Sequence, residues 1–339
     1  MNILITGGAG FIGSNFAHYW ANKYPKDFLY VYDKLTYAAN TKSLKTLESA
    51  KNFKLIKADI CDASTLENTI KDYAIDTIVH FAAETHVDRS IIEPDAFIKT
   101  NILGTFTILE CLKNNPEVRL HHVSTDEVFG SLPIDKPDLK FTEDTAYSPR
   151  SPYSASKAAA DHLVRAYINT YKIKATISNC SNNFGPYCFI EKLIPLTIVR
   201  ALNNEEIPVY GNGMQVRDWI HAEDHCYGID LILKKGTLGE TYLLGGNGER
   251  QNIWIIKEIL KALHKPESLI KHVVDRKGHD ERYAIDFSKA KKELGFEPLK
   301  TIEQRLKETV DWYVNNQDWW AASRTEGYKV AEQYLKKKL

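Results

Sequence analysis

The stretch VSTDEVFG, residues 123–130, places Thr125, Asp126 and Glu127 side by side after an apolar segment. Burial and mutual repulsion raise the pKa of one of two neighbouring carboxyl groups, so one is neutral while the other is ionised. Such a pair supplies a general acid and a general base. In a regular strand the two would point to opposite faces, so we expect the strand to end near Ser124 and the chain to turn. A solvated acidic turn is the alternative that the stretch alone leaves open.

A second candidate pair is Tyr153 and Lys157, which are four residues apart and share one face of a helix. Ser151 as N-cap and Pro152 at the first helical position predict that this helix begins directly before the pair. A neighbouring ammonium group favours the phenolate and should lower the pKa of the tyrosine from about 10. The pair would then remove a hydroxyl proton while a hydride leaves the same carbon. Three other Tyr–Lys pairs have this spacing, so the position after the fifth predicted strand decides the assignment.

The partner for hydride transfer is indicated near the N-terminus. TGGAGFIG contains Gly7, Gly8, Gly10 and Gly13 between the first predicted strand and the first predicted helix. That context is required for a turn whose backbone approaches a pyrophosphate at a helix N-terminus. Asp33 ends the second predicted strand, where its carboxylate can bind a ribose diol and would repel a 2′-phosphate. The pattern therefore predicts bound NAD rather than NADP.

These residues need a sheet to bring them together. Apolar runs at 2–6, 28–33, 53–59, 76–83, 120–125 and 174–180 predict strands, and the segments near 11–24, 41–50, 63–72, 94–114 and 152–171 predict helices. Strands that alternate with helices and are apolar on both faces favour a parallel sheet covered on both sides. We expect an α/β, Rossmann-like doubly wound domain over residues 1–180. A smaller α/β lobe over 181–339 should bind the substrate, with some of its elements returning to the first domain.

The whole-chain composition excludes several classes. The 44 basic and 44 acidic side chains cancel, which argues against broad binding to nucleic acid or anionic membranes. The N-terminus lacks the pattern of a secretion signal, and no stretch approaches the roughly 18 apolar residues of a membrane helix. Five scattered cysteines suit a reducing cytoplasm. His221 and His225 have a zinc-compatible spacing, but no third ligand is evident, so we predict no metal.

Taken together, the motifs resemble the extended short-chain dehydrogenase/reductase family of nucleotide-sugar enzymes. The resemblance covers nearly the whole chain, through TGGAGFIGSNF, DKLTYAAN, FAAETHVDRSI, VSTDEVFGSL, SPYSASKAAADHLV, CSNNFGPY, EKLIPL, VRDWIH and GHDERYAID in this order. Its nearest likeness is to the 4,6-dehydratases, which implies dTDP-glucose as substrate, a recycled NAD and a homodimer. The dimer would form through the segments near 94–114 and 152–171.

The resemblance also implies roles for individual residues. Tyr153 would take the proton of the sugar 4-hydroxyl, Thr125 would bind that hydroxyl, Glu127 would remove the C5 proton, and protonated Asp126 would release the 6-hydroxyl as water. The implied cofactor contacts are Gly7, Gly10, Phe11, Ile12, Gly13, Asp33, Lys34, Leu35, Thr36, Asp59, Ile60, Phe81, Ala82, Ala83, Thr100, Tyr153, Lys157 and Asn183. The implied substrate contacts are Thr85, His86, Asn182, Glu191, Lys192, Leu193, Pro208, Val209, Tyr210, Arg217, Asn252, His279, Arg282 and Tyr283.

The chain departs from the family pattern at Asn179, Cys188 and Ile190, where arginine, glutamine and proline are usual, and phenylalanine replaces tyrosine at Phe129 and Phe184. Other interpretations stay open at this point. A nucleotide-sugar 4-epimerase uses NAD and a Tyr–Lys pair but needs no acid–base pair for loss of water. A decarboxylase of UDP-sugars, a dehydratase of another nucleotide sugar, and a non-catalytic redox sensor are further alternatives.

Overall fold

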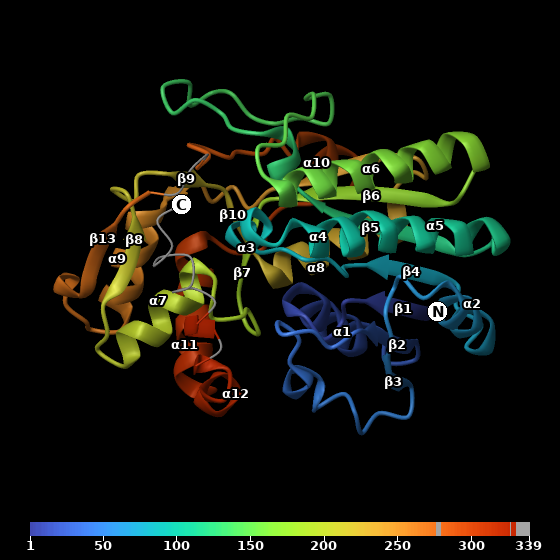
Figure 1. Ribbon diagram of the computed structural model, residues 1–339, viewed down its shortest axis with the longest axis horizontal. Helices are drawn as coiled ribbons and strands as arrows, with labels where there is room; N and C mark the ends of the chain where they lie inside the picture. The colour runs from blue at the N-terminus through green and yellow to red at the C-terminus, as the bar shows by residue number, and fades with distance from the viewer. Residues whose placement is uncertain (276–278, 326, 330–339) are drawn as a thin grey trace.

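The computed structural model describes residues 1–275, 279–325 and 327–329. A seven-stranded parallel sheet, in the order β11-β6-β5-β4-β1-β2-β3, forms its centre (Figure 1). The sheet strands are β1 (Asn2–Thr6), β2 (Phe28–Asp33), β3 (Phe53–Lys57), β4 (Thr77–His80), β5 (Arg119–Thr125), β6 (Ala175–Cys180) and β11 (Thr241–Leu244). The predicted doubly wound α/β class is confirmed, and the strand order reverses between β1 and β4.

Helices cover both faces of the sheet because successive residues of each strand point to opposite sides. Ile3 and Ile5 of β1 pack with α1 and α8, whereas Leu4 packs into a second core with α2, α5 and α6. The covering helices are α1 (Phe11–Lys23), α2 (Ala63–Asp72), α5 (Thr105–Asn114), α6 (Pro152–Tyr171) and α8 (Ala222–Lys235). Apolar cores on both faces explain why the strands read as nearly continuous apolar runs.

Two predicted helices differ from the structure. The segment predicted at 41–50 forms only the short 3-10 helix η1 (Thr41–Leu44), followed by turns whose backbone bonds recur every third residue. A repeat of three stacks Leu44 and Leu47, and both are buried in the α1 core. The segment predicted at 94–114 is divided into α4 (Pro94–Phe97), the π-helical η2 (Ile98–Gly104) and α5, and a short helix α3 (Val87–Ile92) precedes it.

Past residue 180 the chain builds the second lobe and also returns to the sheet. Strand β11 pairs with β6, and helix α8 packs on α1. Helix α10 (Ser288–Leu294) packs against β11 and α8. The lobe consists of β7 (Asn182–Phe184), α7 (Leu193–Leu202), β8 (Ile207–Tyr210), β9 (Val216–Arg217), β10 (Trp219–His221), β12 (Arg250–Gln251), α9 (Asn252–Ala262), η4 (Glu267–Leu269), β13 (Ile270–Val273), α11 (Ile302–Asn315) and α12 (Gln317–Ala321). It lies beside one end of the sheet (Figure 1).

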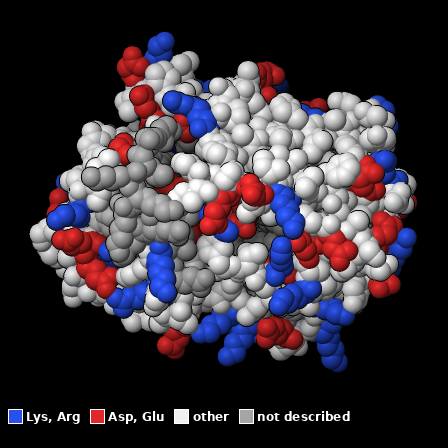
Figure 2. Space-filling model, in the orientation of Figure 1, with Lys and Arg blue, Asp and Glu red and all other residues white. Residues whose placement is uncertain are grey.

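The surface mixes both signs of charge, and Figure 2 shows basic and acidic side chains interspersed over much of the visible face. None of the helices in the described ranges has the length and apolar character that a membrane crossing demands. All five cysteines carry free thiols, and four of them are buried.

Candidate active site

The carboxyl ends of the parallel strands meet at the edge that faces the second lobe, and the glycine turn lies between β1 and α1. Gly7 adopts φ +68°, and a Cβ placed there would lie 2.6 Å from the Ala82 Cα after β4. A Cβ at Gly13 would lie 2.4 Å from the Gly7 carbonyl oxygen. Only glycine permits these approaches. The turn at the N-terminus of α1 therefore has the shape that a pyrophosphate requires.

Asp33 lies at the end of β2, as predicted, and it is nearly buried. Its carboxylate accepts the Ala9 amide at 2.9 Å and the Leu35 amide at 2.8 Å. Burial raises the pKa of Asp33, and these two amides oppose the rise. The carboxylate thus ties the glycine turn to β2. Each oxygen keeps a second lone pair that can accept a ribose hydroxyl.

The remaining predicted cofactor contacts surround this turn. Lys34 forms an ion pair with Asp59 at 2.7 Å, so a lysine that could have attracted a 2′-phosphate is already paired. Ile60 is buried against Gly104 of η2. Asn183 on β7 accepts a hydrogen bond from His225 Nδ1 through its side-chain oxygen at 2.9 Å. The other predicted contacts lie around the same turn in α1, after β2, after β4 and in η2: Gly10, Phe11, Ile12, Thr36, Phe81, Ala83 and Thr100.

Strand β5 ends at Thr125, one residue later than predicted, and the 3-10 helix η3 (Asp126–Phe129) follows at once. The predicted turn is therefore present. Thr125 caps it, because its hydroxyl accepts the Glu127 amide at 3.2 Å. Asp126 is only 1% exposed, whereas Glu127 is half-buried. The turn places the two carboxyl groups in unequal environments.

That inequality separates the protonation states. Burial raises the pKa of Asp126 well above its usual range, and the charges of Glu127 and then Asp218 raise it further. Oδ1 of Asp126 accepts the Thr125 hydroxyl over a long 3.4 Å, and Oδ2 has no hydrogen-bond partner among the described residues. Asp126 is accordingly the neutral carboxylic acid of the pair. The predicted division between an acid and a base has a physical cause in this fold.

Tyr153 and Lys157 lie in the first turns of α6, which starts with a capping box at Ser151 and with Pro152, as predicted. Both side chains are buried, and Lys157 Nζ donates to the Val123 carbonyl at 2.8 Å. The Thr125 side chain lies near enough to Tyr153 to lower the pKa of the phenol. The helix pair thereby meets the carboxyl end of β5.

The expected lowering of the tyrosine pKa is wrong for these side chains alone. Burial raises the pKa of Tyr153 well above its usual value, and the negative charge of Glu127 raises it further, while the Thr125 side chain opposes the rise. Burial also lowers the pKa of Lys157. The prediction considered Lys157 and missed that the carboxylate of Glu127 acts on the same phenol from another element.

Across the site from η3, Arg217 of β9 is 5% exposed. Its guanidinium donates to the Asp280 carbonyl at 3.0 Å and lies 4.2 Å from the centre of the Tyr283 ring. Stacking and a backbone bond fix the plane of the guanidinium. A fixed, buried guanidinium is suited to a diphosphate.

Glu191, which precedes α7, is a third buried carboxyl group near this edge. Its Oε1 accepts the Tyr37 hydroxyl at 3.4 Å, and its Oε2 lies 3.8 Å from His86 Nε2. Burial raises the pKa of Glu191 to about 7, against the opposing charge of Lys192. Lys192 in turn donates to the Thr85 carbonyl at 2.9 Å. The structure thus brings the predicted contacts from two distant segments together.

The other predicted substrate contacts have mixed surroundings. Asn182 and Asn252 each have a buried side-chain oxygen without a hydrogen-bond partner among the described residues. Tyr210 donates to Asp88 at 3.1 Å, and His279 contacts Asp275 at 2.6 Å. Leu193 at the start of α7 and Pro208 in β8 are half-buried.

Two predicted contacts are engaged within the protein. Val209 is buried in the small core under α9. The Arg282 guanidinium binds Glu249 at 2.7 Å and the carbonyl groups of three residues in the 131–150 loop. Their roles toward a substrate stay predictions. His221 and His225 serve the fold as well, because His221 caps α8 and His225 contacts Asn183.

The sequence reasoning missed the side chains that fasten the loop after β4. Asn101 in η2 accepts the Glu84 amide at 2.8 Å and donates to the Glu84 carbonyl at 3.0 Å. It also donates to Ser156 of α6 at 2.8 Å. The π-helical turn that carries Asn101 could not be inferred from a helical pattern. A buried asparagine inside that apolar helix was the available signal.

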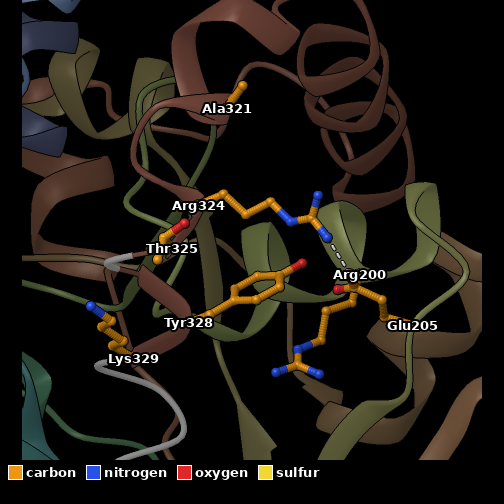
Figure 3. A pocket seen from close by; sticks show the side chains of 7 residues that line it. All are labelled: Arg200, Glu205, Ala321, Arg324, Thr325, Tyr328 and Lys329. Carbon is orange, nitrogen blue, oxygen red and sulfur yellow. Dashed lines mark hydrogen bonds and ion pairs between the residues drawn. The ribbon is translucent and has the colours of Figure 1, made fainter.

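A separate hollow of about 560 Å³ lies in the second lobe (Figure 3). It is lined by Arg200, Glu205, Ala321, Arg324, Thr325, Tyr328 and Lys329. None of the predicted site residues lines it, and Arg324 pairs with Glu205 across it. The hollow is distinct from the cluster at the sheet edge.

The chain is similar to known proteins over most of its length. The family model described as GDP-mannose 4,6 dehydratase matches residues 4–309. A dTDP-glucose 4,6-dehydratase of Escherichia coli is 47% identical, covering 94% of this chain and 95% of the relative. A crystal structure of a dTDP-glucose 4,6-dehydratase from Streptomyces venezuelae with NAD bound superposes with a TM-score of 0.91 at 43% identity, covering 95% of this chain and all of that one. A UDP-glucose 4-epimerase from Thermotoga maritima reaches 0.84 at 25% identity, covering 94% of this chain and 100% of that one.

Proposed function

The chain belongs to the dTDP-glucose 4,6-dehydratase family, and we propose that the cluster at the sheet edge is where it converts dTDP-glucose to dTDP-4-keto-6-deoxy-glucose and water. The enzyme is an NAD-dependent hydro-lyase. The observation that carries the assignment of residues is the unequal burial of Asp126 and Glu127, because elimination of water needs an acid and a base at once.

The glycine turn, the carboxylate of Asp33 and the small residues after β4 fit NAD. When bound there, NAD accepts a hydride from C4 of the sugar and returns it to C6, and its positively charged ring favours the phenolate of Tyr153. Tyr153 removes the proton of the 4-hydroxyl group. The side-chain hydroxyl of Thr125, which lies near Tyr153, binds the same sugar hydroxyl. Lys157 places a positive charge beside the phenolate.

The ketone at C4 acidifies the hydrogen on C5. Glu127 removes this hydrogen as a proton, and Asp126 donates its own proton to the departing 6-hydroxyl, which leaves as water. Glu127 then returns its proton to C5 when the hydride reaches C6. Arg217 holds the diphosphate, and Glu191 with its neighbours binds the sugar. Tyr153 then releases to solvent the proton that it took from the 4-hydroxyl and Asp126 regains a proton from solvent, so cofactor, sugar and enzyme all balance.

We also propose a homodimer and a cytoplasmic location. Figure 2 shows few charged side chains over α5 and α6, in the upper right of the view. Ile98, Leu103 and Phe106 on η2 and α5 are 46%, 52% and 42% exposed. An exposed apolar surface on helices favours the association of two copies of the chain.

The five free thiols support a reducing compartment.

Purified enzyme given dTDP-glucose labelled with deuterium at C4 tests the function. The expected product is a 4-keto-6-deoxy sugar with the deuterium at C6, formed without added reductant. Parallel incubation with UDP-glucose measures the preference for the base. A galactose epimer, or deuterium lost to solvent, would contradict the dehydratase assignment.

A further inference from the structure

A buried aspartate lies one helical turn beyond the Tyr153–Lys157 pair. Asp161 follows Lys157 by four residues in α6, so Tyr153, Lys157 and Asp161 share one face of the helix. Asp161 has no exposed surface. A buried carboxylate without strong partners would be protonated, so its hydrogen bonds decide its charge.

Four side chains bind this carboxylate. Oδ1 lies 3.0 Å from His122 Nε2, and Oδ2 accepts the Ser124 hydroxyl at 2.8 Å. Oδ2 also accepts the Tyr147 hydroxyl at 2.8 Å and the Asn179 amide at 3.2 Å. Burial alone would raise the pKa of Asp161, but the bond from His122 and nearby positive charge hold it below its usual value. Asp161 is therefore an anion inside the protein.

Lys157 is the cation one helical turn before Asp161, on the same face of α6. Burial lowers the pKa of Lys157, and the groups that oppose the fall are Asp161 and Cys180. Burial raises the pKa of the Cys180 thiol to about 12, so the thiol is neutral. The one hydrogen bond of Lys157 given by the structure goes to the Val123 carbonyl, which is uncharged. Asp161 thus supplies the negative charge.

The same carboxylate fixes the strand that carries the reacting groups. His122 and Ser124 alternate along β5 and point to one face, toward α6. The Asn179 amide that donates to Asp161 also donates to the Thr125 carbonyl at 3.1 Å. Asp161 is consequently connected by side-chain hydrogen bonds to the last residues of β5 before η3.

We propose that Asp161 is a positioning residue of the dehydratase: its buried carboxylate keeps the Lys157 ammonium group charged and holds the end of β5 against α6. The proposal rests on the proposed function of Tyr153 and Lys157. It adds a group that touches neither substrate nor cofactor and acts through Lys157.

The titratable neighbours of Asp161 leave this pairing intact. On β5, burial and the charge of Lys157 lower the pKa of His122, which favours the neutral imidazole, while the bond to Asp161 opposes this fall. From the loop before α6, burial raises the pKa of Tyr147 beyond the working range. Arg165 of α6, two helical turns beyond Lys157, donates to the Tyr147 hydroxyl at 2.8 Å and to the Thr241 hydroxyl at 3.3 Å. Cys180 on β6 is neutral, as described above.

Asp161→Asn tests the proposal because it removes the charge and keeps the shape. The measurement is the pH dependence of dTDP-glucose oxidation, followed as absorbance of reduced cofactor in a single turnover. We expect the alkaline limb, where Lys157 loses its proton, to move down by about one to two pH units, and the maximal rate to fall about tenfold or more. A purely structural role would lower the rate equally at every pH.

Asp230→Asn is the matched control. Asp230 is also buried and binds Tyr19, Tyr24 and Lys23 between α8 and α1, away from the sheet edge. We expect it to lower the melting temperature and to leave the pH profile unchanged. Asp161→Glu keeps the anion and should recover at least half of the pH shift. An unshifted profile in Asp161→Asn, beside an active parent enzyme, overturns the proposal, whereas an inactive parent overturns the proposed function.

If Asp161→Asn does not fold, the protonation state of Lys157 in the parent enzyme tests the proposal. Nitrogen-15 NMR of lysine-labelled protein, with the Lys157 signal assigned through Lys157→Arg, reports the charge of the ammonium group. We expect Lys157 to stay protonated above pH 8. A neutral Lys157 amine at pH 7 overturns the proposal.

Discussion

Replacing Glu127 with glutamine should block the elimination of water and leave the oxidation at C4 measurable. The amide cannot remove the C5 proton, so elimination should slow by about 10²- to 10⁴-fold, the usual contribution of a general base. Oxidation at C4 should remain, since Tyr153 carries it. Reduced cofactor should therefore accumulate, instead of being consumed by the return of hydride to C6.

The pH dependence of that oxidation carries the sharper test. The negative charge of Glu127 is the second-largest cause, after burial, that raises the pKa of Tyr153. Removal of the charge lowers the pKa of Tyr153, so the phenolate forms at lower pH. The acidic limb of the pH–rate profile for C4 oxidation should therefore shift to lower pH. A nearby charge is worth about one pH unit, equal to about 1.4 kcal/mol. Stopped-flow absorbance at 340 nm across pH measures the limb.

Asp126→Asn is the matched partner of this variant. Asp126 is neutral at working pH because burial and Glu127 raise its pKa. The amide therefore changes no charge, and elimination should be lost while the acidic limb stays in place. A limb that moves in Asp126→Asn and not in Glu127→Gln would show that the two carboxyl groups have the opposite protonation states, and would refute the reasoning.

Two further predictions concern the binding of NAD and the stability of the fold. Gly7→Ala should abolish copurification of NAD, measured by absorbance of the denatured extract, because φ is +68° and the new Cβ would lie 2.6 Å from the Ala82 Cα; full NAD content would contradict the proposed turn. Arg305→Met should lower the free energy of unfolding by about 3–5 kcal/mol in urea titration, since its side chain and that of Asp224 are each only 2% exposed and lie 2.5 Å apart. Lys307→Met, at an exposed pair, should cost at most about 1 kcal/mol.

Much of the sheet could be predicted because its signals are local. The glycine turn after β1 and the start of α6 at Ser151 and Pro152 each lie within one short segment, and both were placed correctly. The segment at 41–50 has a helical pattern too, but Leu44 and Leu47 are packed under α1 in three-residue turns. The division of 94–114 by a π-helix likewise depends on Asn101, whose partners Glu84 and Ser156 come from elsewhere.

The wrong sign for the pKa of Tyr153 has the same origin as the failure to find Asp161. The spacing of four residues made Lys157 visible from Tyr153, and one more turn of that period reaches Asp161. What gives Asp161 its charge comes from separations of 14 to 39 residues, in β5, the following loop and β6. Glu127, which opposes ionisation of Tyr153, also lies on another element. A short motif therefore identifies the groups that react. Their protonation states depend on Glu127, which only the fold brings near, and on Asp161, whose hydrogen-bond partners only the fold brings near. Asp161 and Glu127 are for this reason the positions to change first.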